Sequence, residues 1–300
     1  MLLLAATSLI WGVHWPVTKL GLADAPPFTY GVLRVAGGLA CLVVLLLIQG
    51  RLRLPPRQDL PIVLSVGLGQ MAASIALMNV GLRFVPAGRS AVLVYSSPLW
   101  VAGLQALVLR TGLRLREGVG LGLGLAGLAI LLNPQAIDWR SGDVVLGSGL
   151  LLLSAVIWAA TILHLRRHRW TASPLELGPW ELLVALVPLV VLALATERSE
   201  PVHWEPALVG YLLYSGPLAT AFAFWASQWV QRSLSPLASS IGFLAVPVVG
   251  LVAGAVMLGE PIGPADLVGL VVALCGIALV SLAPTAQTVP EPQLRPAGPA

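Results

Sequence analysis

Long apolar runs separated by short polar breaks are the feature that most constrains the fold of this 300-residue chain. A helix needs roughly 20 apolar residues to cross a bilayer, and many of the runs are that long. Charged residues make up 10% of the chain, whereas a soluble domain has about 25%. Mean hydropathy is +0.90, and 57% of the residues are hydrophobic. A soluble fold could not cover its surface with so few charges, so the sequence predicts a multi-pass membrane protein.

The polar breaks divide the chain into ten predicted helices, and we expect an all-α membrane protein. The approximate bounds of these helices are 2–21, 28–48, 60–82, 86–109, 116–133, 144–165, 174–195, 206–230, 235–258 and 264–283. The tail 284–300 is rich in proline, and we expect it to be disordered. No basic segment precedes the first apolar run, so we expect no cleavable signal peptide.

The basic residues predict the orientation of the chain, because cytoplasmic loops carry an excess of Lys and Arg. With a cytoplasmic N-terminus, the outside loops carry only Arg83, Arg89, Arg140 and Arg198. The inside loops and tail then carry Arg51, Arg53, Arg57, Arg110, Arg114, Arg116, Arg166, Arg167, Arg169, Arg232 and Arg295. We therefore expect both termini to be cytoplasmic. The preference for Arg over Lys is typical of a GC-rich bacterial genome and suggests a bacterial inner (cytoplasmic) membrane.

The two halves of the chain are related in sequence. Residues 98–132 align with 247–281 at an offset of 149, so that Pro98 matches Pro247. "SLIW" (8–11) aligns with "AVIW" (155–158), which matches Trp11 with Trp158. Five helices per repeat is an odd number, so the second copy enters the membrane inverted, a common plan of secondary transporters. We expect one repeat over 1–135 and its inverted copy over 136–283.

These features resemble the drug/metabolite transporter superfamily, specifically its ten-helix EamA type, and are similar to amino-acid exporters of the YddG type. The resemblance rests on "SLIWGVHWPVTKL" (8–20), "VYSSPLW" (94–100), "FLAVPVVG" (243–250), "MLGEPIG" (257–263) and a Gly-x6-Gly pattern in the last helix of each half. It implies two inverted five-helix repeats around a central cavity that is lined by the first, third, fourth, sixth, eighth and ninth helices. One position departs from the internal symmetry, because Thr111 stands where Glu260 would be mirrored.

Polar and aromatic residues form stripes on the helices that the resemblance assigns to the cavity. Helical spacing places Trp11, His14 and Trp15 on one face of the first helix. Trp11 lies near the bilayer midplane, so an interfacial belt explains it poorly. We interpret the stripes as an amphipathic substrate-binding wall, with ordinary helix packing as the alternative for each aromatic residue. The candidate residues are Trp11, His14, Trp15, Gln70, Met78, Tyr95, Trp158 and Tyr214.

Several single residues have more than one interpretation. His14 could carry a proton, form a hydrogen bond to substrate, or be a satisfied interior histidine. Lys19 could extend to the membrane interface or bind a carboxylate. Pro98 and Pro247 interrupt the fourth and ninth helices at matching positions, which predicts either a gating or cavity-shaping role or a packing kink. Arg34 and Glu181 are costly intramembrane charges at matching positions of the two repeats, and we expect structural roles without mutual pairing.

Two further motifs have simple interpretations. "GLGLGLAG" contains a formal GxGxxG at Gly122, Gly124 and Gly127, but a dinucleotide loop needs a preceding strand. Close packing of helices through small residues explains these glycines better. Cys41 and Cys275 lie far apart in sequence within apolar runs, and we expect them to be small buried hydrophobes.

The sequence and the resemblance together predict a secondary transporter that exports small amphipathic metabolites, chiefly amino acids including aromatic ones, by alternating access. Two alternatives stay open: a multidrug or nucleotide-sugar carrier of the same fold, and an integral-membrane enzyme of lipid metabolism. Such an enzyme usually shows acidic or histidine clusters for metals and phosphates, and the inside loops lack one. We expect no catalytic residue, metal or cofactor. The expected partners are a small-molecule substrate and membrane lipid, with no nucleic acid, and we expect a monomer.

Overall fold

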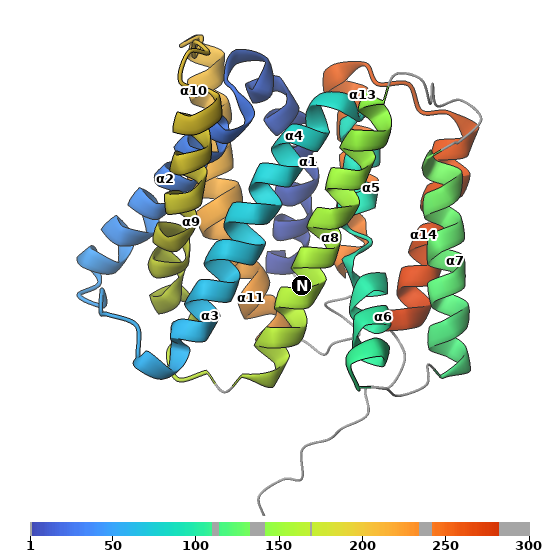
Figure 1. Cartoon of the computed structure of the whole chain (residues 1–300), viewed down its shortest axis with the longest axis horizontal. Coiled ribbons are helices and arrows are strands. Elements are labelled where there is room, and N and C mark those ends of the chain that lie inside the picture. Colours follow the sequence, from blue (N-terminus) through green and yellow to red (C-terminus); the bar gives the residue numbers. More distant parts are fainter. Residues whose placement is uncertain (1, 110–113, 133–141, 169, 234–241, 282–300) are drawn as a thin grey trace, which may run out of the picture.

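The protein is a bundle of helices, and the residues that the structure describes contain no β-strand. This computed structural model describes residues 2–109, 114–132, 142–168, 170–233 and 242–281. Figure 1 shows the long helices running side by side along a common direction. The all-α class predicted from the sequence is confirmed. The tail 284–300 lies outside the described residues.

The first half contains two long helices followed by segmented ones. The elements are α1 (Leu2–Asp24), α2 (Pro27–Ile48), η1 (Arg57–Asp59), α3 (Leu60–Leu64), η2 (Ser65–Ala73), α4 (Ser74–Phe84), α5 (Ala87–Val94), α6 (Ser97–Leu109) and α7 (Leu115–Leu132). The second half contains α8 (Asp143–Arg167), α9 (Pro174–Thr196), α10 (Pro206–Leu213), η3 (Tyr214–Phe222), α11 (Ala223–Ser233), α13 (Ala245–Leu258) and α14 (Pro264–Ser281).

Local signals in the sequence account for several helix ends. Proline is the first residue of α2, α9, α10 and α14, where its missing N–H costs nothing. Ser173 and Glu176 form a reciprocal capping box at the start of α9, which satisfies backbone donors that have no partner within the helix. Helix α13 ends at Leu258 and is capped by Gly259, whose φ of 66° is left-handed and favours glycine.

Eight helical stretches of the described residues are long and apolar enough to cross a membrane. They are Pro27–Ile48, Arg57–Phe84, Ala87–Leu107, Leu115–Leu132, Asp143–Arg167, Pro174–Thr196, Pro206–Val230 and Pro264–Ser281. The protein is therefore a multi-pass membrane protein. Helix α1 and the shorter apolar helix α13 occupy the other two predicted segments. The count of ten membrane-spanning helices stays a prediction.

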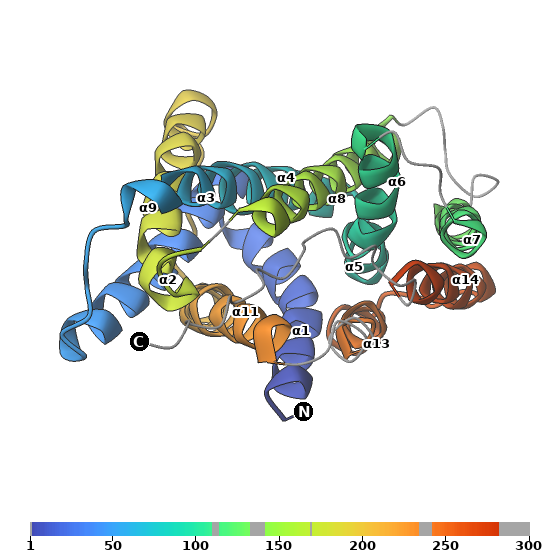
Figure 2. The same ribbon diagram turned by 90° about the horizontal axis from the view of Figure 1, so that it is seen from below.

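Helices from the two halves of the chain pack against each other throughout the bundle. The pairs with the most extensive contact are α7 with α14, α1 with α13, α2 with α9, and α4 with α8. Figure 2 shows α7 and α14 side by side at one end of the bundle and α2 beside α9 at the other. Two halves that interleave in this way cannot be separate globular domains.

Glycines form the contact between α7 and α14. A Cβ on Gly127 would overlap the backbone of Ala273, and one on Gly120 would lie 2.9 Å from the carbonyl oxygen of Gly276. A Cβ on Gly122 would meet nothing within 4 Å. The GxGxxG pattern therefore lies within a membrane helix, and Gly127 serves close helix packing there.

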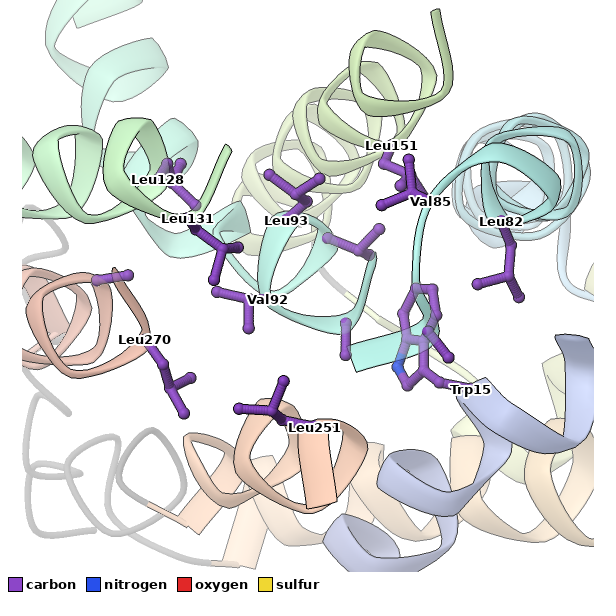
Figure 3. Packing of buried hydrophobic residues seen from close by; sticks show 14 of the residues in the cluster. Trp15, Leu82, Val85, Val92, Leu93, Leu128, Leu131, Leu151, Leu251 and Leu270 are labelled. Atoms are coloured by element: carbon purple, nitrogen blue, oxygen red, sulfur yellow. The ribbon is translucent and has the colours of Figure 1, made fainter. Parts of the chain in front are cut away.

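Two large apolar clusters fill the interior. The first lies where α1, α4, α5, α7, α8, α13 and α14 meet, and Figure 3 shows Trp15 on its edge among leucines and valines. The second lies around α2, η2 and α9. Cys41 and Cys275 belong to neither, because both are exposed on the surface of the bundle. The expectation that they are buried was wrong: both lie on helices long and apolar enough to cross a membrane, and an apolar side chain needs no burial there because lipid tails are equally apolar.

Candidate functional site

Two π-helical segments lie at corresponding places in the two halves. Segment η2 spans Ser65–Ala73 and η3 spans Tyr214–Phe222, so both ends of η3 are displaced from those of η2 by 149 residues. This is the same offset that aligns Pro98 with Pro247. A π-helix this long is unusual, and π-helical turns occur frequently at functional sites. Each segment carries a predicted site residue, Gln70 in η2 and Tyr214 in η3.

The structure brings three of the predicted site residues together where α1 meets η3. The ring of His14 stacks on that of Tyr214, with centroids 6.4 Å apart and an interplanar angle of 12°. The Tyr214 hydroxyl donates to the Ile10 carbonyl at 2.8 Å. Trp11 donates through Nε1 to the Ala219 carbonyl of η3 at 3.0 Å. An imidazole and two amphipathic rings thus meet a stretch of helix with irregular backbone bonding.

His14 is 5% exposed. Its Nε2 lies 3.1 Å from the Thr18 hydroxyl one turn further along α1. This contact satisfies one ring nitrogen, as the interior-histidine interpretation requires, and leaves the other nitrogen for a further partner.

A polar network extends this cluster to α2. The Tyr30 hydroxyl lies 2.7 Å from the Ser215 hydroxyl. Thr220 donates from its hydroxyl to the Ser215 carbonyl at 2.6 Å. Arg34 donates from Nε to the Thr220 hydroxyl at 2.8 Å. The network therefore ends on a guanidinium group within the membrane-spanning part of the bundle.

Arg34, Tyr30 and Thr220 were not among the predicted site residues. The family resemblance assigns the cavity to other helices, so α2 supplied no candidate residue. An intramembrane arginine in an apolar run is itself a functional signal. It could have placed Arg34 among the candidates. Its hydrogen-bond partner on η3, Thr220, could not be found from the sequence, because it lies 186 residues away.

The other predicted residues lie outside this cluster. Trp15 is 3% exposed and belongs to the first apolar cluster, which favours the packing alternative. Met78 and Tyr95 are partly buried against the same cluster. Gln70 is buried in η2, and Trp158 is partly buried on α8. Among the described residues, no hydrogen bond or ring contact joins Gln70 or Trp158 to the His14–Tyr214 pair.

Both predicted proline positions adjoin breaks in a helix. Helix α5 ends at Val94, and α6 resumes at Ser97, one residue before Pro98. Helix α13 begins at Ala245, directly after a turn at Leu244 and two residues before Pro247. Tyr95 lies in the break between α5 and α6. Pro98 has no backbone N–H to donate, so the interruption beside Tyr95 follows from this proline.

A carboxylate joins helices at the end of the bundle where α1 ends. Lys19 donates from Nζ to Glu260 at 3.1 Å and to the Val85 carbonyl at 2.9 Å. Glu260 also accepts from the backbone N–H groups of Ala87 (2.7 Å) and Gly88 (3.2 Å) at the start of α5. Lys19 thus pairs with a carboxylate of the protein itself. Thr111, the residue aligned with Glu260, lies outside the described residues.

Two further carboxylates bind backbone N–H groups at opposite ends of the bundle, Glu197 at the start of α2 and Asp59 in the segment before α9. Glu197 accepts from the N–H groups of Phe28 and Thr29 at 2.8 and 2.7 Å, and from the Thr29 hydroxyl at 2.8 Å. Asp59 accepts from the N–H groups of Thr171 and Ala172 and from the Thr171 hydroxyl at 2.6 Å. The negative charge of Glu197 stabilises the N–H groups of the first turn of α2, which have no partner within the helix.

The two intramembrane charges occupy corresponding sites with different surroundings. The backbone of Arg34 packs on Gly216 of η3, and the backbone of Glu181 packs on Gly67 of η2. A Cβ added to either glycine would lie within 3 Å of the carbonyl oxygen of the charged residue. Glu181 is fully buried, and neither carboxyl oxygen has a hydrogen-bond partner. Arg34 and Glu181 do not pair, as expected. Within the described parts of the chain, no group of three or more His, Cys, Asp or Glu residues could hold a metal ion.

The profile of the EamA-like transporter family matches residues 1–133 and 145–282. The chain belongs to the EamA-like transporter family. This membership, within the drug/metabolite transporter superfamily, confirms the resemblance noted in the sequence and identifies the protein as a transporter.

Relatives of this EamA-like protein carry transporter names. The uncharacterized transporter YoaV of Bacillus subtilis is 27% identical, over 92% of this chain and 94% of the relative. A probable amino-acid metabolite efflux pump of Salmonella typhimurium is 25% identical over 90% of each chain. A probable terminal-alkyne amino-acid exporter of Streptantibioticus cattleyicolor is 28% identical, over 93% and 92%. A protein of known crystal structure shares the fold, with a TM-score of 0.63. Its sequence is 21% identical to this chain, and the match covers 93% of this chain and 96% of that protein.

Proposed function

We propose that this EamA-like transporter exports small amphipathic metabolites, chiefly amino acids including aromatic ones, by alternating access. The observation that carries the proposal is the contact of His14 and Trp11 with η3. Rings, hydroxyls and an imidazole meet there beside interrupted helix bonding, which suits a ligand with an apolar body and polar ends. The names of two relatives, an amino-acid efflux pump and an amino-acid exporter, support the same substrate class.

The proposed mechanism uses two inverted five-helix repeats, 1–135 and 136–283. The recurrence of a nine-residue π-helix at the offset of the sequence repeat supports this division. Glu197, directly after the end of α9, bonds to the start of α2. The starts of these two helices, each the second of its half, therefore lie at opposite ends of the bundle, which supports the inversion. In this scheme the repeats rock about the site, and the breaks before Pro98 and Pro247 allow the helix halves to move.

The remaining assignments complete the proposal. Trp11, His14, Tyr214, Tyr95 and Gln70 contact substrate in the course of the cycle, together with Trp158 and Met78 from the flanking helices. The protein acts as a monomer in a bacterial cytoplasmic membrane with both termini inside. The excess of arginine in the predicted inside loops supports this orientation.

Counterflow in liposomes tests the function. Purified protein would be reconstituted and assayed with a panel of labelled amino acids and, separately, with cationic dyes. We expect exchange of aromatic and aliphatic amino acids and no exchange of the dyes. The guanidinium of Arg34, which has no acidic partner among the described residues, repels cations. Exchange of dyes without amino acids would replace the proposal with the multidrug alternative. Liposomes that contain the Trp11→Ala/Tyr214→Phe double variant serve as the matched control for site-specific flux.

A further inference from the structure

Arg34 carries a positive charge for which the described residues offer no counterion. Its side chain is buried, with 8% of the residue exposed. Nε donates to Thr220, whereas the buried Nη1 has no hydrogen-bond partner. An arginine stays protonated in proteins. An uncompensated buried charge costs several kcal/mol, so its retention here calls for a partner during the working cycle.

The guanidinium is bonded to the segment that the candidate site uses. Thr220 of η3 accepts from Arg34 Nε and donates to the Ser215 carbonyl, and Tyr214 of the same segment stacks on His14. The unsatisfied donor therefore lies on the side of α2 that packs against η3.

Comparison with the other half shows that the fold does not require a polar network at this place. Arg34 matches Glu181 at an offset of 147, and Tyr30 matches Leu177. Ser215 and Thr220 of η3 match Val66 and Met71 of η2 at the offset of 149. The residues that match Tyr30, Ser215 and Thr220 are buried members of the second apolar cluster: Leu177, Val66 and Met71. The same helix geometry is therefore built with apolar neighbours around Glu181 in one half and with a hydrogen-bonded guanidinium in the other.

We propose that Arg34 is the anchor for the carboxylate of the transported substrate. The free Nη1 donates to a carboxylate oxygen, while Thr220 fixes the orientation of the guanidinium through Nε. The apolar part of the ligand then lies toward the His14–Tyr214 pair and Trp11. This assignment rests on the proposed export of amino acids and adds a requirement that the transported molecule carry a carboxylate.

The wild-type protein provides the first test. Labelled phenylalanine and phenylalaninamide would be compared in counterflow, because the amide keeps the ring and the amine but has no carboxylate. We expect flux of phenylalanine to exceed that of the amide by roughly 10- to 100-fold, the ratio that corresponds to one hydrogen bond to a charged group. Equal flux of the two compounds would overturn the anchor and leave amino-acid transport intact. If neither compound moves, the proposed substrate class and the anchor are both wrong.

Variants at the two matching positions provide the second test. Arg34→Gln should lower phenylalanine flux roughly 10- to 100-fold and leave amide flux unchanged, so that the preference disappears. Arg34→Lys keeps the charge and should keep part of the preference for phenylalanine over the amide. This variant provides the test if Arg34→Gln does not fold. Glu181→Gln changes an intramembrane charged residue at the corresponding site and should leave the preference intact. A preference that survives in a folded Arg34 variant, or that is lost equally in Glu181→Gln, would overturn the proposal.

Discussion

Trp11 and Trp15 lie four residues apart on α1, and their surroundings give them different roles. Trp15 is buried in an apolar cluster, whereas Trp11 is partly buried and directs its Nε1 to the backbone of η3. The ring of Trp11 also lies 5.8 Å from that of Phe243, between their centroids. Trp15 is therefore a buried member of the core, whereas Trp11 packs on the edge of the second apolar cluster and also bonds to a segment with unusual backbone bonding.

These surroundings predict opposite phenotypes for two identical substitutions. Trp15→Ala should lower the free energy of unfolding by about 3–5 kcal/mol and reduce the flux of every substrate in parallel with the amount of folded protein. Trp11→Ala should cost less stability and change the order of preference between aromatic and aliphatic amino acids. Melting temperature and counterflow of several amino acids would be measured on each variant. A uniform loss of flux in Trp11→Ala that follows loss of folded protein would assign this residue to packing.

The residue scale also shows the limits of sequence analysis. The predicted trio Trp11, His14 and Trp15 share a helix face by periodicity. Periodicity cannot tell which neighbouring helix each ring meets, and Trp15 meets a leucine cluster instead of the site. Arg34 was visible as a charge in an apolar run, but its missing counterion is a property of the assembled bundle.

At the scale of elements, the bounds of the helices were largely predictable. The apolar runs end at Pro, Gly and charged residues, and most observed helices begin and end within a few residues of the predicted bounds. The π-helical segments were not predicted, because side-chain patterns near a helical period do not distinguish one backbone bonding register from another. The internal repeat in the sequence did indicate that any irregularity in one half could recur in the other.

The contact between α7 and α14 yields a prediction at this scale. Gly127→Val should destabilise the protein by about 1–3 kcal/mol, because the new side chain would overlap the backbone of α14. Gly122→Val on the same helix is the matched control and should be tolerated, since nothing lies within 4 Å of its Cβ position. Thermal unfolding in detergent would be measured for both. Equal effects of the two variants would show that this pair of helices does not pack as described.

The whole molecule is joined at both ends by contacts between its halves. Lys19 pairs with Glu260 and Arg89 with Asp266 at one end, and Arg51 pairs with Glu176 at the other. Each pair joins a residue of 1–135 to a residue of 136–283. Rocking of two repeats about a central site must break such contacts at the end that opens.

The orientation of the whole chain can be tested directly. A fluorescent reporter that matures only in the cytoplasm would be fused after Pro284, and a phosphatase that is active only in the periplasm would be fused at the same place. We expect fluorescence and no phosphatase activity, because the arginine-rich loops favour the cytoplasmic side. The opposite result would reverse the orientation or change the number of membrane crossings.

The carboxylate contacts at the two ends should bias the conformational equilibrium in opposite directions. Glu260→Gln removes the charge that joins Lys19 to the start of α5, and Asp59→Asn removes the charge at Thr171 and Ala172. A hydrogen bond to a charged group contributes about 1.5–3 kcal/mol. Losing one at a single end should shift the populations of the two open states by about tenfold or more.

Thiol labelling from outside the cell measures this shift. Tyr95→Cys, in a background with Cys41→Ala and Cys275→Ala, places one thiol at the break between α5 and α6. We expect Glu260→Gln to raise its labelling by a membrane-impermeant maleimide, since the end that holds Lys19 faces outward in the proposed orientation. Asp59→Asn should lower that labelling, because it favours opening toward the cytoplasm. Labelling that changes in the same direction in both variants, at unchanged melting temperature, would show that these contacts stabilise the bundle without controlling access to the site.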